Sequence, residues 1–212
     1  MKRSRLGLLQ TETIDILNEE ELSKFNHEFL EKNSIIYSDF IKIIILKSGS
    51  AKVSIYEDGE EFIIYNLQQN NITILDEACA IETLEDSEIY SLDVKDIDEI
   101  LSNFEFSKAY TQTLVNIIIL QRQIIQSILF ENAKGRIASF LIELAKEQNL
   151  KQGEYYYVFL PFSLKVLSSF VGLKRQSAST AFNELIKEGV LTRTSPHECL
   201  ILDYEKLQSY TT

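Results

Sequence analysis

One stretch of this sequence concentrates hydrogen-bond donors in a way that could do chemistry. Between Lys174 and Asn183 every side chain that is not apolar can donate a hydrogen bond, and no acidic residue occurs before Glu184. Arginine can donate to both acceptors of guanine, glutamine can pair with adenine, and serine or threonine can bind phosphate oxygens. With one serine that precedes the stretch, the candidate DNA-contacting residues are Ser163, Lys174, Arg175, Gln176, Ser177, Ser179 and Thr180. The same composition also suits an ordinary solvent-exposed helix, so the choice between these two interpretations depends on the surrounding elements.

Two short helices joined by a tight turn are predicted around these donors. Ser163 is a favourable N-cap for a helix over Leu164–Val171, and Gly172 can adopt the left-handed conformation that ends a helix. A second helix is expected over residues 175–188, and Gly189 ends it. The apolar positions that would hold this second helix to the domain are Ala178, Ala181, Phe182, Leu185 and Ile186. The donors are therefore expected on its outward and leading faces.

A hairpin is predicted directly after the two helices. Its strands are Val190–Thr194 and Leu200–Leu202, joined by the turn Ser195–Glu198, and a short strand at Tyr155–Phe159 precedes the helices. An amphipathic helix is expected still earlier, over Lys134–Gln148. Two helices followed by a hairpin form the winged helix-turn-helix plan, in which the second helix enters the major groove of DNA. This combination favours DNA binding over a merely solvated helix surface.

The first part of the chain has the pattern of an all-β domain. The expected strands are Ile41–Leu46, Ala51–Tyr56, Ile72–Leu75 and Glu88–Val94. Gly49 can supply a positive φ in one turn, and the pair Asp58-Gly59 is a strong hairpin signal. Several short strands with regular turn signals indicate a sandwich or barrel. Residues 12–32, ahead of them, carry apolar positions at helical spacing and are predicted to form one or two short helices.

Residues 107–132 contain no glycine or proline and are predicted to form one long helix. Its apolar positions alternate at spacings of three and four, which is typical of a coiled-coil seam. The candidate dimer-interface residues are Leu114, Ile118, Gln121, Ile125 and Ile128, with Gln121 as a polar residue that sets the register. A second set, expected to cover the β domain, is Val115, Ile117, Ile119, Ile124 and Leu129. The alternative is a helix buried entirely within its own domain.

The net charge of −11 is unevenly distributed. Residues 1–130 carry 11 Lys and Arg against 23 Asp and Glu, whereas residues 131–212 carry 10 against 9. The acidity therefore lies in the first part, and the last part is nearly neutral. Phosphate binding depends on a local basic surface and not on global charge, so this balance is compatible with DNA binding.

Several classes of protein lack support in the sequence. There is no run of 18 apolar residues and no signal peptide, so no membrane association and a cytoplasmic location are expected. Two cysteines cannot build a disulfide framework. No phosphate-binding glycine-rich loop, HExxH or GxSxG motif occurs, and we expect no enzyme activity.

The motifs above resemble the Crp/Fnr family, the cyclic-AMP receptor protein and fumarate–nitrate reduction regulators. GRIASFLIELAKE at 135–147 and FSLKVLSSFVGLKRQSASTAFNELIKEGVL at 162–191 resemble the family's C-terminal domain. ILKSGSAKVSIYEDGEEFIIYNLQQNN at 45–71 is similar, more weakly, to its β-roll. The resemblance implies that Arg175 and Gln176 open the recognition helix and that Thr180 follows one turn later. Because the family usually has Glu and Arg where Gln176 and Thr180 stand, we expect a different half-site sequence.

The resemblance implies an α+β fold with three parts. These are an N-terminal β-roll sensor domain at 1–104 (jelly-roll-like, cyclic-nucleotide-binding-like), a dimerisation helix at 105–132 and a winged helix-turn-helix at 133–212. The implied protein is a homodimer that binds a palindromic site on double-stranded DNA and regulates transcription. RNA polymerase is a further candidate partner, and the effector stays open.

The sensor part departs from the family's known ligand sites. Where cyclic-nucleotide members carry an Arg-Ser phosphate clamp, this sequence has Glu77 and Ala78, and a carboxylate would repel the phosphate, so cyclic AMP is not expected. An iron–sulfur cluster needs about four cysteine thiolates, which one chain does not provide. Haem is left open, with Cys79 or His27 as candidate axial ligands. The simpler interpretations are a buried structural thiol for Cys79 and a polar helical surface for His27.

Two alternatives to a ligand-controlled regulator follow from these gaps. In the first, the β-roll is only a dimerisation scaffold and its pocket is filled by its own side chains. In the second, the winged fold binds a protein partner instead of DNA.

Overall fold

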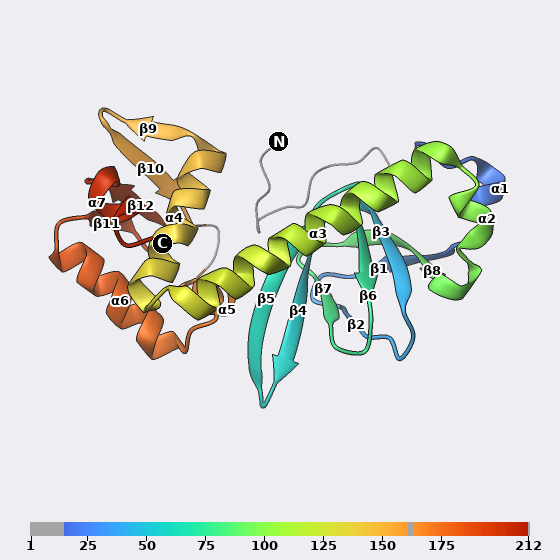
Figure 1. Ribbon diagram of the computed structural model, residues 1–212, viewed down its shortest axis with the longest axis horizontal. Coiled ribbons are helices and arrows are strands. Elements are labelled where there is room, and N and C mark those ends of the chain that lie inside the picture. Colours follow the sequence, from blue (N-terminus) through green and yellow to red (C-terminus); the bar gives the residue numbers. More distant parts are fainter. Residues whose placement is uncertain (1–14, 161–162, 212) are drawn as a thin grey trace. The chain divides into compact units, whose positions relative to one another are not determined.

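The computed structural model describes residues 15–160 and 163–211, and the chain divides into two compact units, Met1–Gln121 and Arg122–Thr212 (Figure 1). The N-terminal residues 1–14, where a signal peptide was not expected, and the pair Pro161-Phe162 lie outside the described residues.

The first unit is built from two antiparallel four-stranded sheets. Their strand orders are β1-β8-β3-β6 and β2-β7-β4-β5. The strands are β1 Asn26–Leu30, β2 Ile35–Ile36, β3 Lys42–Ser48, β4 Ala51–Glu57, β5 Glu60–Leu67, β6 Ile72–Leu75, β7 Ala80–Thr83 and β8 Ser87–Asp93. The pairing of strand 8 with 1, 7 with 2, 6 with 3 and 5 with 4 is that of a hairpin folded over on itself, which is the plan of an eight-stranded jelly roll. The predicted β-roll is confirmed.

The turns of this unit follow local sequence chemistry. Asp58 and Gly59 have φ of 51° and 79° and form the two-residue loop between β4 and β5, where Glu57 pairs with Glu60. Positive φ at both central residues gives the turn a twist that matches the strands. Gly49 has a φ of 91° between β3 and β4 and lies against the backbone of Asp86 and Ser87.

The prediction of helix over residues 12–32 is wrong for most of its length. Among the described residues, only α1, Glu19–Leu22, is helical there, and the chain then enters β1. Strand β1 pairs antiparallel with β8 from Asn26 opposite Ser91 to Leu30 opposite Ser87. Pairing with a strand about sixty residues away therefore outweighs the local helical spacing.

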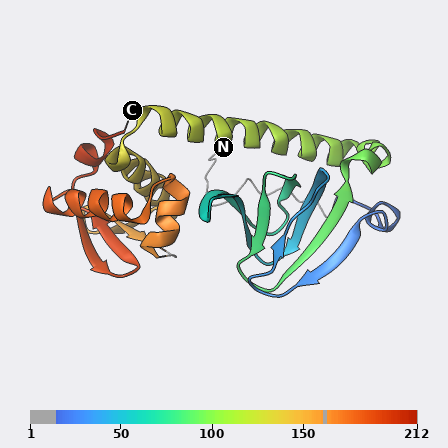
Figure 2. The same cartoon turned by 90° about the horizontal axis from the view of Figure 1, so that it is seen from below.

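Helix α3, Phe104–Phe130, follows the 3-10 turn η1, Val94–Asp96, and α2, Asp98–Leu101. Its first turns pack on the strands, as Figure 2 shows from below. Phe106 is fully buried in a cluster with Phe25, Ile43 and Ile100. The buried face of α3 consists of Phe106, Thr113, Asn116, Ile117, Leu120 and Ile124.

The opposite side of α3 is an exposed apolar stripe, which we call the α3 stripe. It consists of Val115, Ile118, Ile125, Ile128 and Leu129, each between 42% and 67% exposed. The assignment of Val115 and Leu129 to the second, buried face of the helix is wrong, whereas Ile117 and Ile124 are buried and Ile119 is half-buried. The reason is geometric: Val115 and Leu129 lie three or four residues from Ile118 and Ile125 and so share their face.

The second unit combines four helices with one antiparallel sheet. After the end of α3 it contains α4 Ala133–Gln148, β9 Leu150–Gln152, β10 Tyr155–Phe159, α5 Leu164–Val171, α6 Arg175–Lys187, β11 Leu191–Ser195, β12 Glu198–Ile201 and α7 Tyr204–Gln208. The sheet order is β11-β12-β10-β9. Strand β9 and helix α7 were not predicted. The two helices and the hairpin of the winged helix-turn-helix are present as expected.

We expect Gly49→Ala to lower the free energy of unfolding by about 2 kcal/mol or more, because an L-residue is strained at this φ and its Cβ would overlap the backbone. That Cβ would lie 2.7 Å from the Asp86 carbonyl oxygen. Gly59→Ala is the matched control, since a Cβ there meets nothing within 4 Å. It should cost only about 1 kcal/mol for its backbone conformation. Urea unfolding measures both, and equal losses would contradict the close approach at Gly49.

Candidate nucleic-acid interface

The turn between α5 and α6 is fixed by local caps. Ser163 Oγ accepts a hydrogen bond from the Val166 backbone N–H at 3.4 Å and caps α5. Gly172 ends α5 in the left-handed conformation, with φ 62° and ψ 43°, and Leu173 N–H donates to the Ser168 carbonyl at 3.0 Å. The chain then reverses within two residues and α6 begins. Both caps are where the sequence predicted them.

Helix α6 has one buried and one exposed face. Ala178, Ala181, Phe182 and Leu185 are at most 4% exposed. Exposed on the other side are Lys174, Arg175, Gln176, Ser177, Thr180 and Asn183, while Ser179 is half-buried. The structure therefore brings six of the seven predicted contact residues together over the first turns of α6. Ser163 is also exposed, at the start of α5.

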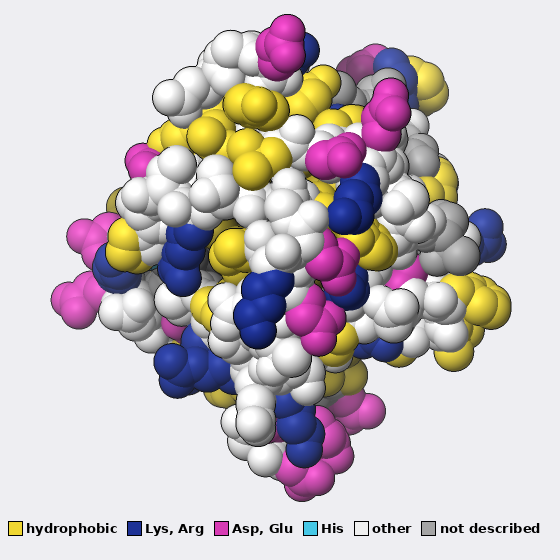
Figure 3. Space-filling model, turned by 90° about the vertical axis from the view of Figure 1, so that its left-hand side faces the viewer, with side chains coloured by type: hydrophobic (Ala, Val, Ile, Leu, Met, Phe, Trp, Pro, Cys, Tyr) yellow, Lys and Arg dark blue, Asp and Glu magenta, His cyan; other side chains and the backbone are white. Residues whose placement is uncertain are grey.

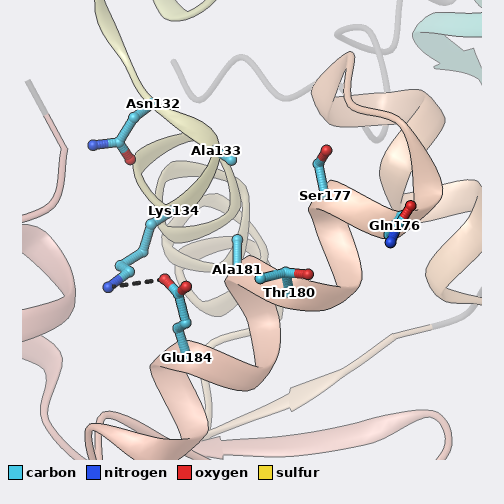
Figure 4. Close-up of a pocket in the computed structure, with 8 residues that line it drawn as sticks. All are labelled: Asn132, Ala133, Lys134, Gln176, Ser177, Thr180, Ala181 and Glu184. Atoms are coloured by element: carbon cyan, nitrogen blue, oxygen red, sulfur yellow. Dashed lines mark ion pairs between the residues drawn. The ribbon is translucent and has the colours of Figure 1, made fainter.

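Two acidic residues, Glu184 in α6 and Glu188 directly after the helix, are paired with a lysine from α4. Lys134 Nζ lies 3.3 Å from Glu184 Oε2, as Figure 4 shows. The same nitrogen lies 2.5 Å from Glu188 Oε1. The hydrogen bond from Lys134, with a second from the Tyr210 hydroxyl, holds the pKa of Glu188 below its ordinary value. Hydrogen bonds to Glu188 and Glu184 raise the pKa of Lys134. This pairing keeps the carboxylates at the far end of α6 neutralised and away from its donor-rich start.

A groove of about 600 Å³ separates the start of α4 from the exposed face of α6. Its lining residues are Asn132, Ala133, Lys134, Gln176, Ser177, Thr180, Ala181 and Glu184 (Figure 4). Asn132 Oδ1 accepts from Gly135 N–H at 3.0 Å and caps α4, so the first turn of that helix borders the groove. Helix N-termini favour anions such as phosphate. Sequence reasoning missed Asn132 and Lys134, although an asparagine directly before an amphipathic helix is itself a capping signal.

The wing is tied to the rest of its unit. Arg193 Nη2 donates to the Pro196 carbonyl at 2.7 Å and Nε donates to the Ser195 carbonyl at 3.0 Å, which closes the turn between β11 and β12. Leu160 N–H donates to the His197 carbonyl at 2.6 Å. Viewed from the side of this unit, basic and acidic side chains are interspersed among uncharged ones (Figure 3). Placement of individual donors, and not a broad basic field, distinguishes the α6 surface.

In the first unit, the segment compared with the phosphate clamp is a plain turn. It joins β6 to β7, with Glu77 and Ala78 exposed and Ala78 N–H donating to Asp76 Oδ1 at 3.0 Å. Close by in sequence, Tyr65 and Thr73 are both buried and their hydroxyls lie 2.7 Å apart. Burial raises the pKa of the Tyr65 hydroxyl well above its ordinary value, so it stays a neutral phenol.

Neither haem-ligand candidate is arranged as a ligand. Cys79 is half-buried, and burial together with Asp76 raises the pKa of its thiol to about 11, which disfavours the thiolate. His27 lies on strand β1 and not on the expected helix; its Nε2 is 2.6 Å from Glu88 Oε1 and its ring stacks on Tyr90. In the described part of the chain, no three His, Cys, Asp or Glu side chains cluster as a metal site. In this arrangement the thiolate of Cys79 is disfavoured and Nε2 of His27 is paired with Glu88, so neither side chain is presented as a free ligand.

Comparison with known proteins finds a family model that matches most of the second unit. Residues 135–210 match the family model of the Crp-like helix-turn-helix domain. No curated protein matches the chain in sequence.

Solved structures match nearly the whole chain. A double mutant of CooA from Carboxydothermus hydrogenoformans is 24% identical, with a TM-score of 0.83 over 96% of each chain. The imidazole-bound form of CooA from the same organism, described as a CO-dependent transcription factor, is 25% identical, with a TM-score of 0.55 over 99% of this chain and 100% of that one. CprK complexed with OCPA is 16% identical, with a TM-score of 0.79 over 98% of each chain. The resemblance stated from the sequence and the α+β fold class are both confirmed.

The two faces of α6 should separate stability from binding. Phe182→Ala removes a side chain that is 2% exposed and should lower the free energy of unfolding by about 3–5 kcal/mol. Thr180→Ala, two residues earlier on the exposed face, should change it by less than about 0.5 kcal/mol. Urea unfolding monitored by circular dichroism measures both. A large loss with Thr180→Ala would contradict the assigned faces.

Proposed function

Because residues 135–210 form a Crp-like helix-turn-helix domain on a chain with the fold of Crp/Fnr regulators, we propose that this protein is a sequence-specific, DNA-binding transcription regulator without enzyme activity. The observation that carries the proposal is the exposed start of α6, which presents donors and no carboxylate. A helix of this kind, held by its opposite face and followed by a wing, suits the major groove.

Each donor has a role that its chemistry supports. Arg175 and Gln176, at the tip of α6, contact base edges, with arginine directed to guanine and glutamine to adenine. Thr180 lies one turn later on the same exposed face. Ser163 and Lys174 contact phosphates, and the first turn of α4 provides a further phosphate position across the groove. Gln176 offers an amide where a carboxylate would accept from cytosine, so the half-site differs from one that a glutamate reads.

The protein acts as a homodimer through the α3 stripe. Contiguous exposed apolar side chains at coiled-coil spacing are unfavourable in water and mark an interface. Four of the five predicted seam residues are exposed, among them Ile118, Gln121 and Ile125, and Leu114 is half-buried. A two-fold dimer presents two α6 helices, which requires a palindromic site on double-stranded DNA with half-sites about 34 Å apart.

Helix α3 also has the length and apolar composition of a membrane-spanning helix. However, its C-terminal half carries Gln121, Arg122 and Gln123 in succession, all exposed. In a membrane-spanning helix these polar and charged side chains would have to enter the hydrocarbon core of the bilayer, which is unfavourable in free energy. A partner helix is therefore the better cover for the α3 stripe, and we place the protein in the cytoplasm and not at a membrane.

The functional division that we propose is a β-roll sensor domain at 1–104, a dimerisation helix at 105–132 and a DNA-binding domain at 133–212. The boundary between the compact units falls inside α3, after Gln121, because one continuous helix serves both. RNA polymerase is the proposed further partner of the DNA-bound dimer.

The signal is not cyclic AMP, since the β6–β7 turn offers Glu77 and no basic side chain to a phosphate. An effector-free β-roll is a second candidate, and the buried Tyr65–Thr73 pair, which fills part of the interior with the chain's own side chains, favours it.

Selection of duplexes from a random DNA library by the full chain, followed by salt titration of the selected site, tests the proposal. A DNA reader that neutralises several phosphates should lose orders of magnitude in affinity between about 50 and 200 mM salt. Enrichment of no sequence, or a salt-independent affinity, would favour the protein-binding alternative.

Arg175→Ala should weaken binding to the selected site by about 1–3 kcal/mol and relax the preference at one base position. Lys187→Met is the matched control, because Lys187 is an exposed cation at the opposite end of the same helix. It should leave the base preference intact. Repeated selection with each variant gives the readout, and an unchanged preference with Arg175→Ala would show that another residue reads the site.

Ile125→Glu should convert the dimer to a monomer, since it places a carboxylate in the middle of the α3 stripe. Ile41→Glu is the control, at a position that is 53% exposed compared with 55% for Ile125. Sedimentation velocity measures the oligomeric state. A monomeric wild-type chain, or a dimer that survives Ile125→Glu, would contradict the proposed interface.

A further inference from the structure

Arg136 on α4 donates to three backbone carbonyls from two separate parts of the second unit. Its Nη2 donates to the Ile128 carbonyl at 2.8 Å and its Nε donates to the Glu131 carbonyl at 3.2 Å. Its Nη1 donates to the Gly172 carbonyl at 3.1 Å. A guanidinium is planar and its donors have fixed directions, so three bonds from one group define the relative position of their acceptors.

One of these carbonyls, that of Ile128, lies in the last turn of α3, and that of Glu131 directly follows the helix. The last carbonyls of a helix have no partner within it, and a cation there interacts favourably with the helix dipole. The same helix end is fixed to α4 by a second contact. The Glu131 carboxylate accepts from Ser127 Oγ and from Ser139 Oγ, each at 2.5 Å. Only Glu131 and Asn132 separate the two helices.

The third carbonyl belongs to the turn of the helix-turn-helix. Gly172 is the left-handed residue that ends α5, and α6 begins three residues later at Arg175. Arg136 therefore connects the end of α3 directly to the turn that directs the start of α6. Arg136 itself is half-buried and its three nitrogens are bonded to the protein, so its contribution to DNA binding is indirect.

We infer that Arg136 is a positioning residue that sets the direction of α6 relative to the last two turns of α3, and thereby the half-site spacing that the dimer accepts. The inference rests on the proposed function, because spacing has meaning only for a dimer that reads two half-sites. Lysine is not an equivalent here, since its ammonium is a point charge on a flexible stem and cannot hold three carbonyls in a plane.

The test uses the full chain and the duplex that it selects, together with two duplexes whose half-sites are one base pair closer or one base pair farther apart. We expect the wild type to prefer its selected spacing by roughly tenfold or more, and Arg136→Met to reduce that preference to about threefold or less. Arg136→Lys keeps the charge and should show the same loss of preference. Lys187→Met, which removes a cation without touching these carbonyls, should retain the wild-type preference.

Spacing preference is the deciding readout because a merely structural role would not change it. If Arg136→Met and Arg136→Lys weaken binding equally at all three spacings, Arg136 only stabilises the domain and the inference is wrong. If Arg136→Met does not fold, as judged by circular dichroism, Arg136→Lys alone decides. A wild type that selects no DNA overturns the proposed function, whereas a wild type that binds, with variants of unchanged preference, overturns only this inference.

Discussion

A narrow stripe of buried side chains on α6 determines what the rest of that helix can do. Ala178, Ala181, Phe182 and Leu185 pack inward, and the two alanines let α6 lie close to its neighbours. A helix of thirteen residues is marginal alone in water, so this packing is the reason that it exists as a helix. The donors are exposed because the stripe fixes which side faces inward. The contacts that we propose between α6 and DNA therefore depend on hydrophobic burial on the opposite face of the helix.

Helix α3 also has two different faces. One side contributes Phe106 and Leu120 to the interior, and the other leaves the α3 stripe uncovered. A helix that is apolar on both sides has to bury both, and a single chain covers only one of them. The acidic charge of the first part of the sequence lies elsewhere in the chain from the donors of α6, and Lys134 neutralises the acids that share their helix. Global acidity and local phosphate binding are compatible for this reason.

Features governed by neighbouring residues could be predicted from the sequence. The Asp58-Gly59 turn, the strand Ile72–Leu75, and the caps at Ser163 and Gly172 depend on residue types within a few positions, and the structure has them as expected. Features made by distant partners could not. Strand β1 forms because β8 pairs with it, and the groove beside α6 exists because Asn132 and Thr180, from different parts of the chain, both line it. The faces of α3 could be assigned only in part. Neighbouring apolar residues, such as Leu114 and Val115 or Ile128 and Leu129, each fit the three-and-four spacing, so the spacing does not say which of them faces outward.

The connection between α3 and α4 has a consequence for the DNA. With only Glu131 and Asn132 between the helices, and with Ser127, Ser139 and Arg136 bonded across them, the protein has little slack at this junction. In the proposed dimer, a site whose two halves are slightly out of phase has to be accommodated by twisting or bending the duplex. The elastic energy of that deformation depends on the base steps between the half-sites. The composition of a spacer that no side chain touches thus becomes part of what the protein recognises.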